Sequence, residues 1–255
     1  MHTLAERALT YLSEGPRPPL DIAREVLGLA RANRVVAERL VLALLGGDPR
    51  FAFDEEGSWA VRPEPPLGHL APAELPYAVV DVETTGMRAR GGDRVTELAV
   101  VHVDGERTTV AFESLVNPGR PIPPFITRLT GIGDEMVAEA PRFEEVADRV
   151  LAALSGRVFV AHNARFDLSF VRAELERAND IPFRPPMLDT VRLARVLVPE
   201  LPRRNLDTVI HWFGISTDRR HRAAGDALAT AEVLRRLLDR AAERGVGSWQ
   251  ELSSL

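Results

Sequence analysis

The sequence predicts an α/β fold, with helices covering a mixed sheet, in the larger part of a chain of 255 residues. Three strand-like segments follow one another closely, and Asp104-Gly105 supplies a tight turn between two of them, which indicates an antiparallel meander. Segments with helical periodicity come next and flank a further buried strand. The predicted strands cover residues 77–83, 95–103, 108–115 and 157–161, and the predicted helices around the last strand begin with 124–137 and 143–154.

The composition is that of an ordinary globular protein, since 45% of the residues are hydrophobic and no apolar run approaches membrane-spanning length. The N-terminus lacks the pattern of a secretory signal, so the cytoplasm is the expected compartment. The absence of cysteine excludes disulfides, thiolate zinc sites and cysteine nucleophiles, so any metal must be held by Asp, Glu or His. A net charge of −5 argues against nonspecific coating of nucleic acid but allows a local basic channel.

Residues 1–61 carry the pattern of a small accessory domain with three helices and a hairpin, which resembles a winged-helix module. Asp21 is the expected N-cap of the second helix, and aromatic residues on both sides of 54–57 indicate the hairpin. The helical periodicity rests on Leu4, Ala8 and Leu12 in the first helix and on Val36, Leu40, Val41, Leu44 and Leu45 in the third.

This module is expected either to bind DNA or a partner protein, with Arg31, Arg34 and Arg39 as candidate contacts, or to serve as a packing domain. It has no overall basic bias. The proline-rich segment 62–76 indicates a fairly stiff linker, and a second domain over 77–244 with a tail at 245–255 is expected to follow.

Two carboxylates mark the end of the first strand of the second domain. Asp81 and Glu83 project from the same face because side chains alternate along a strand. Like charges this close are costly unless a positive group compensates, and a divalent cation is the natural candidate among oxygen ligands. A solvated strand edge or a salt bridge is the alternative interpretation of this pair.

Two further carboxylates fall on the apolar faces of predicted helices, where each needs a partner. Asp167 shares its face with Phe170 and Leu175, in a helix that Asn163 is placed to cap. Asp226 lies in the stripe of a later helix that also contains Ala229, Val233 and Leu237. His221 precedes Asp226 by five residues, about 140° away on a continuous helix, so both reach one site only if His221 lies in the preceding loop.

Asp81-Val-Glu-Thr-Thr-Gly86, His162-Asn-Ala-Arg-Phe-Asp167 and His221-x4-Asp226 resemble, in order, the three motifs of the DEDDh family of 3′→5′ exonucleases. Within the family, the chain most resembles the proofreading (epsilon) subunit of bacterial DNA polymerase III and its stand-alone relatives. The resemblance spans about residues 77–242 and does not cover the N-terminal module. The sister subclass has Tyr where this chain has Arg222, so the histidine subclass is indicated.

This resemblance implies a ribonuclease-H-like fold with a mixed five-stranded sheet. It implies that Asp81, Glu83, Asp167 and Asp226 hold two Mg²⁺ or Mn²⁺ ions, and that His221 is the general base. The terminal nucleotide is expected to contact Thr84, Thr85 and Gly86, with Phe166 as an apolar or stacking surface. His162 is expected to be a hydrogen-bonded neighbour of the site.

The leading functional hypothesis is a metal-dependent exonuclease that releases nucleoside monophosphates from DNA 3′ ends in proofreading or repair. The same chemistry on RNA or oligonucleotides, and a noncatalytic nucleic-acid-binding module, are the alternatives. The complete set of four carboxylates and one histidine disfavours the noncatalytic module, because a degenerate scaffold is expected to lose unpaired buried carboxylates. The expected partners are DNA 3′ ends and a DNA polymerase or another replication or repair protein, with no membrane.

Overall fold

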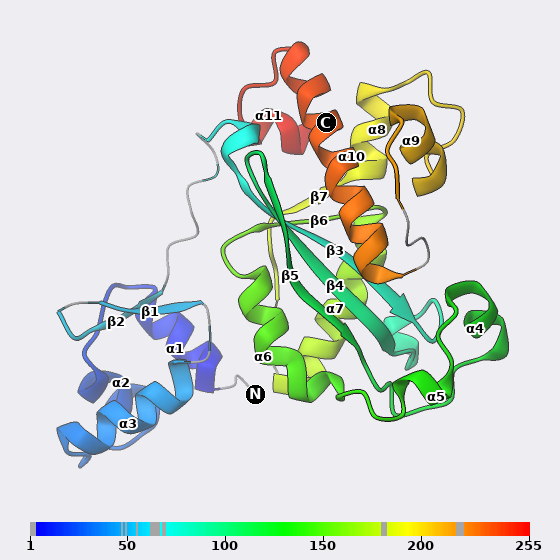
Figure 1. The fold of residues 1–255 in the computed structure, drawn as a ribbon. Coiled ribbons are helices and arrows are strands. Elements are labelled where there is room, and N and C mark those ends of the chain that lie inside the picture. The colour runs from blue at the N-terminus through cyan, green and yellow to red at the C-terminus, as the bar shows by residue number, and fades with distance from the viewer. Residues whose placement is uncertain are drawn as a thin grey trace. The chain divides into compact units, whose positions relative to one another are not determined.

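The computed structural model describes residues 4–46, 48, 50–54, 56–61, 67, 70–179, 183–217 and 222–255. The chain divides into two compact units, residues 1–65 and 66–255, which are drawn in Figure 1. No helix in the described part of the chain combines the length and apolar character needed to cross a bilayer.

The N-terminal unit consists of three helices followed by an antiparallel hairpin, in the order the sequence predicts. The second helix begins at Pro19 rather than after Asp21, because proline at the first helical position is already restricted to a helical φ. The elements are α1 (Leu4–Leu12), α2 (Pro19–Glu25), α3 (Arg34–Leu45), β1 (Phe51–Phe53) and β2 (Trp59–Val61). Its assignment as a winged-helix module stays a prediction.

Helix α3 buries a narrower stripe than predicted. Ala37, Val41 and Leu45, spaced four residues apart, face the core of this unit. Val36 and Leu40 are exposed instead, so the outer surface of α3 is partly apolar. Because the Nε of the candidate DNA contact Arg34 lies 2.7 Å from Glu38 Oε1, that cation is already paired. DNA binding by this helix therefore stays a prediction.

The second unit is built on a five-stranded mixed sheet with the strand order β5-β4-β3-β6-β7, which confirms the predicted fold class. The antiparallel part contains β3 (Pro76–Thr84), β4 (Val95–Asp104) and β5 (Arg107–Leu115). The parallel part adds β6 (Val158–Ala161) beside β3, and β7 (Met187–Asp189) beside β6.

Helices pack on both faces of this sheet (Figure 1). One face is covered by α6 (Phe143–Leu154) and α7 (Ala164–Asn179). The opposite face is covered by α8 (Thr190–Leu197), α9 (Leu206–Phe213), α10 (Ala223–Glu243) and α11 (Trp249–Ser254). The central strand β3 alternates between the two cores, since Tyr77 and Val79 face α10 while Ala78 and Val80 face α6 and α7.

The segment predicted as one helix over 124–137 forms two helices, α4 (Pro124–Thr130) and α5 (Asp134–Val137). Gly131 ends α4 with φ 74°, a left-handed conformation that glycine adopts without steric cost. The local helical signal was therefore correct, but the helix terminator inside it was missed.

Both ends of the second unit pack more closely than their sequence suggests. Leu75, placed by the sequence in the linker, is fully buried in the core beneath α10, and the Tyr77 hydroxyl donates to the Pro72 carbonyl at 2.6 Å. Leu252, in the predicted tail, is buried in the same core as part of α11. Apolar anchors therefore hold both segments, although the predicted domain limits themselves stay a prediction.

Candidate metal centre

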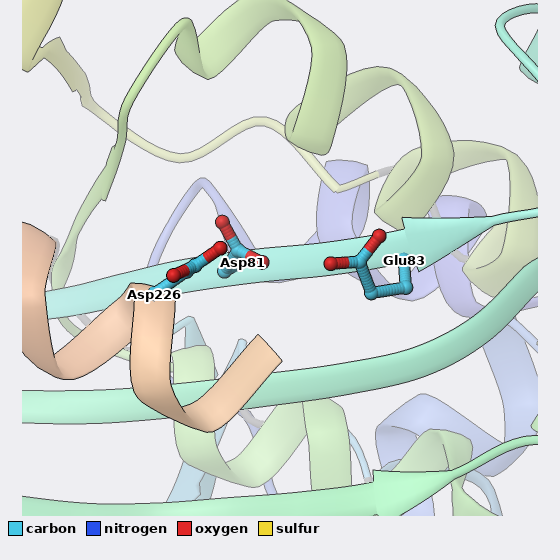
Figure 2. Close-up of side chains that lie close together, drawn as sticks. All are labelled: Asp81, Glu83 and Asp226. Atoms are coloured by element: carbon cyan, nitrogen blue, oxygen red, sulfur yellow. The ribbon is translucent and has the colours of Figure 1, made fainter. Parts of the chain in front are cut away.

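Three carboxylates converge where β3 meets the first turn of α10. Asp81, Glu83 and Asp226 each offer an oxygen, and these oxygens lie within 4.8 Å of one another. Figure 2 shows Asp226 reaching from α10 to the side of Asp81, with Glu83 further along the same strand. Asp81 and Glu83 continue the row of Tyr77 and Val79, so the predicted sharing of one face is confirmed.

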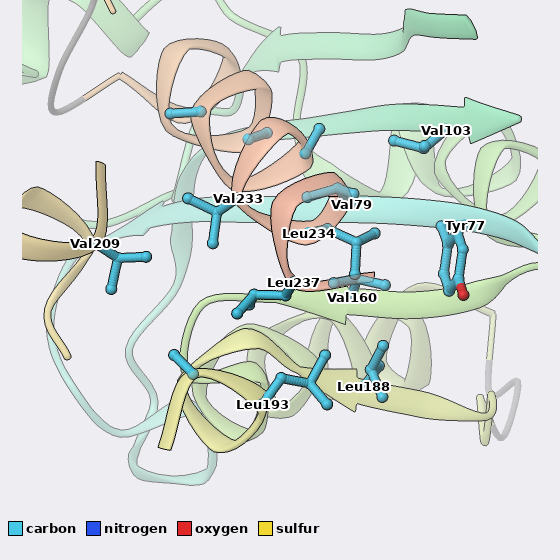
Figure 3. Close-up of a cluster of buried hydrophobic side chains, with 14 of the residues drawn as sticks. Tyr77, Val79, Val103, Val160, Leu188, Leu193, Val209, Val233, Leu234 and Leu237 are labelled. Carbon is cyan, nitrogen blue, oxygen red and sulfur yellow. The ribbon is translucent and has the colours of Figure 1, made fainter. Parts of the chain in front are cut away.

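Packing of α10 carries Asp226 to the sheet. Val233, Leu234 and Leu237 of this helix press against Val79 and its neighbours, as Figure 3 shows. Asp226 continues the buried face at the N-terminal end, where it is only 7% exposed. A carboxylate in the first turn of a helix is also stabilised by the helix dipole. The same apolar periodicity that predicted the helix therefore delivers the carboxylate to the site.

Asp167 lies in the first turn of α7 and contacts the strand that carries Asp81 and Glu83. It is 4% exposed, and its Oδ1 accepts a hydrogen bond of 3.2 Å from the backbone N–H of Val82, the residue between Asp81 and Glu83. Burial raises the pKa of Asp167 to about 8, and the negative charges of Glu83 and Asp189 add to the effect. A positive ion at this position would therefore offset a large electrostatic cost.

The turn after β3 is held by the side chains predicted to bind the terminal nucleotide. The Thr84 hydroxyl donates to the Gly86 carbonyl at 2.6 Å, and the Thr85 hydroxyl accepts from the Arg94 N–H at 3.0 Å. A Cβ on Gly86 would lie 2.4 Å from an Asp93 carboxylate oxygen, so a side chain there would require the Asp93 side chain to shift. Nucleotide binding by Thr84, Thr85 and Gly86 stays a prediction.

Asn163 and Phe166 lie on either side of the first residue of α7, and each has a role predicted from the sequence. Asn163 precedes α7 with φ 76°, in the left-handed region rather than the extended conformation of an ordinary N-cap. The capping of α7 by Asn163 stays a prediction. The ring of Phe166 packs against Phe170, with 5.0 Å between centroids, and its predicted contact with a base stays a prediction.

His162 is a hydrogen-bonded neighbour of the site, as expected. Its Nδ1 lies 2.9 Å from the Thr190 hydroxyl, and its Nε2 lies 2.8 Å from the Arg204 carbonyl. These contacts join the end of β6 to the start of α8 and to the segment before α9. His221, the predicted general base, lies outside the described residues.

Sequence reasoning missed two buried glutamates, each of which is paired with an arginine. Glu174 of α7 is 1% exposed and accepts from Arg94 Nε at 2.8 Å and from the Val95 N–H at 3.1 Å. Glu97 of β4 accepts from Arg222 at the start of α10. A signal for Glu174 was present, because it falls on the same apolar face as Asp167 two turns earlier.

Comparison with known proteins identifies relatives of the second unit. A family model described as Exonuclease (RNase_T) matches residues 78–234. A DNA polymerase III PolC-type protein of Caldanaerobacter subterraneus subsp. tengcongensis is 38% identical over 185 residues, which cover 72% of this chain and 13% of the relative. A DNA polymerase III subunit epsilon-like protein of Rhodobacter capsulatus is 43% identical over 188 residues, which cover 70% of this chain and 27% of the relative. The chain thus spans less than a third of the length of these curated relatives.

A solved structure has the same fold. Exonuclease X in complex with 5′ overhanging duplex DNA aligns with a TM-score of 0.55 and 25% identity, over 70% of this chain and 98% of that chain. The family match and the mixed sheet together confirm the resemblance drawn from the three motifs and the ribonuclease-H-like fold it implied. This chain belongs to the exonuclease (RNase_T) family.

Proposed function

We propose that this protein is a divalent-metal-dependent 3′→5′ exonuclease that hydrolyses phosphodiester bonds at DNA 3′ ends and releases nucleoside monophosphates. One observation carries the proposal: Asp81, Glu83 and Asp226 offer oxygens within 4.8 Å of one another in a chain of the exonuclease family. DNA is favoured as the substrate because the relatives are named as DNA polymerase III proteins. Proofreading or repair beside a DNA polymerase, in the cytoplasm, belongs to the same proposal.

The donor set fits Mg²⁺ or Mn²⁺. All three converging side chains are carboxylates, and hard divalent cations prefer oxygen ligands. Asp167 would join them, because its buried carboxyl group lies against the strand that carries Asp81 and Glu83. When bound, two such ions would neutralise charge on the phosphate and on the leaving oxygen.

The chain's own residues would orient and deprotonate the reactants. His221 would take the proton of the attacking water as a neutral imidazole. As the water oxygen bonds to phosphorus, the bond to the 3′ oxygen of the preceding nucleotide breaks, which frees a nucleoside 5′-monophosphate. Thr84, Thr85 and Gly86 would contact the terminal nucleotide, and Phe166 would offer it an apolar surface.

Removal of divalent metal tests this proposal. After dialysis against a chelator, the protein is expected to leave 5′-labelled single-stranded DNA intact and to shorten it from the 3′ end once Mg²⁺ or Mn²⁺ is added, because carboxylate oxygens are the proposed ligands. Zn²⁺ is expected to substitute poorly. Mismatched duplex and RNA of equal length, assayed in parallel, define the substrate class, and preferential cleavage of RNA would overturn the choice of DNA. Full turnover in excess chelator would exclude the metal-dependent mechanism.

The His221→Ala protein is expected to turn over DNA more slowly by roughly 10² to 10⁴-fold, because the attacking water loses its base. Binding of DNA and Mn²⁺ is expected to change little, and the acidic limb of the pH–rate profile to flatten. His211→Ala, on the exposed side of α9, is the control histidine and should retain wild-type turnover. Near-wild-type turnover by His221→Ala would assign the base to another group.

A further inference from the structure

Glu97 is a buried carboxylate in the strand beside the candidate metal centre. It lies on β4 directly opposite Glu83 of β3, and only 1% of its surface is exposed. Cross-strand partners in an antiparallel pair project from the same face, so Glu97 faces α10 together with Glu83. A buried carboxylate this close to another one requires a strong compensating partner.

Two groups at the start of α10, a guanidinium and a backbone N–H, compensate the charge of Glu97. Arg222 Nε lies 3.0 Å from Glu97 Oε1 and 3.1 Å from Oε2, and Arg222 Nη2 lies 2.6 Å from Oε1. The backbone N–H of Ala223, the first residue of α10, donates to Glu97 Oε2 at 2.9 Å. One carboxylate therefore binds both the guanidinium and the helix backbone.

This contact replaces an ordinary helix cap. The first N–H groups of a helix lack partners within the helix, and Arg222 at the N-cap position makes no side-chain cap of its own. Glu97, on a strand 126 residues earlier in the chain, accepts a hydrogen bond from one of these N–H groups, that of Ala223. The first turn of α10 is thereby tied to β4 as well as packed on it.

The same turn holds Asp226. Its backbone N–H donates to the Arg222 carbonyl at 3.0 Å, so a short path of hydrogen bonds leads from Glu97 through Arg222 to the carboxylate-bearing residue. The hydrogen bond to Glu97 and its charge raise the pKa of Arg222, and the charges of Glu113 and Glu83 add to this effect. The Arg222 side chain remains 41% exposed, so the guanidinium sits at the edge of the site rather than within the core.

We propose that Glu97 and Arg222 form a positioning pair, which fixes the first turn of α10 so that Asp226 meets Asp81 and Glu83 at metal-binding distance. The inference rests on the proposed function for its kinetic consequences, but the structural consequences stand alone. An arginine suits this role because its planar fork engages both carboxylate oxygens, which a lysine cannot do.

The first test is kinetic. Glu97→Gln in the full chain is expected to lower kcat by roughly 10 to 100-fold, as loss of groups that orient metal ligands does, with the KM for the oligonucleotide unchanged. Arg222→Lys keeps the charge but loses the fork, so a smaller fall is expected. The matched control is Asp104→Asn at the other end of β4, which removes the charge and one of the two acceptors in the pair with Arg157, whose bonds are 2.6 and 3.2 Å long. That control should retain the wild-type kcat.

The second test needs no activity. Mn²⁺ titration followed by electron paramagnetic resonance should show affinity reduced by roughly 10 to 100-fold in Glu97→Gln. Hydrogen exchange should be faster at the Ala223 and Asp226 amides but unchanged at Leu237. If Glu97→Gln does not fold, the same measurements on Arg222→Lys decide.

The outcomes separate this inference from the proposed function. Active wild-type protein together with wild-type kcat and Mn²⁺ affinity in the folded variants would overturn the positioning pair. Inactive wild-type protein would overturn the proposed function, and the Mn²⁺ and exchange measurements would still decide whether Glu97 and Arg222 position Asp226. If Arg222→Lys raises the KM for the oligonucleotide without lowering kcat, Arg222 is assigned to substrate binding and the inference is overturned.

Discussion

Asp226→Asn is expected to slow cleavage of DNA 3′ ends by roughly 10³-fold or more, since loss of a metal ligand removes several kcal/mol of charge stabilisation. The substitution keeps the size of the side chain, so α10 should stay packed on the sheet. In metal-free buffer the variant should be as stable as the wild type or slightly more stable, because it removes repulsion from Asp81 and Glu83. Single-turnover kinetics and urea unfolding measure the two effects.

Asp239→Asn, on the exposed side of the same helix, is the control and should retain wild-type cleavage. The control also tests the preparation, because a contaminating nuclease would cleave DNA equally in all samples. A folded Asp226→Asn protein with wild-type turnover would remove Asp226 from the site. A variant that unfolds would assign it a structural role instead.

Asp167→Asn is expected to stabilise the metal-free protein in a pH-dependent way. Burial raises the pKa of Asp167 to about 8, whereas an aspartate in the unfolded chain titrates near about 3.9. Between these two pH values the carboxyl group of Asp167 is ionised in the unfolded chain but protonated in the folded protein. Its contribution to the free energy of unfolding therefore falls by about 1.4 kcal/mol for each unit by which the pH rises. Asparagine does not titrate and can still accept from the Val82 N–H.

Below about pH 4, urea unfolding in chelator should therefore show the same pH dependence of the free energy of unfolding for the wild type and Asp167→Asn. From there to about pH 8, the free energy of unfolding of Asp167→Asn should increasingly exceed that of the wild type. Saturating Mg²⁺ should reduce that advantage, because the cation favours the ionised carboxylate of the wild type. Asp239→Asn serves again as the control. If the free energies of unfolding of Asp167→Asn and the wild type differ by the same amount from pH 4 to pH 8, the raised pKa of Asp167 is contradicted.

Much of the site could be predicted because it depends on local periodicity. Alternation along 77–83 placed Asp81 and Glu83 on one face, and β3 extends from Pro76 to Thr84. Helical spacing placed Asp226 on the buried side of α10, and Asp167 on that of α7. Such patterns require only neighbouring residues, so a single sequence contains them.

The remaining features of the fold and the site depend on contacts between residues far apart in the sequence, or on single residues that end a helix. The pairing of Glu97 with Arg222 spans 125 residues, and that of Arg94 with Glu174 spans 80. No local period encodes either pair. The strand β7 has three residues and becomes a strand through its pairing with β6, so its own sequence carries a weak signal.

The packing of α10 across β3 makes assembly of the carboxylate cluster depend on a late part of the chain. Asp81 precedes Asp226 by 145 residues, so almost the whole second unit is translated before the third carboxylate of the cluster is present. Until α10 is made, the apolar face of the sheet that it covers stays exposed, and exposed apolar surface makes a growing chain prone to aggregation. A chain that ends before α10 would lack both Asp226 and the apolar residues that pack on Val79, so it could not assemble the cluster of three carboxylates.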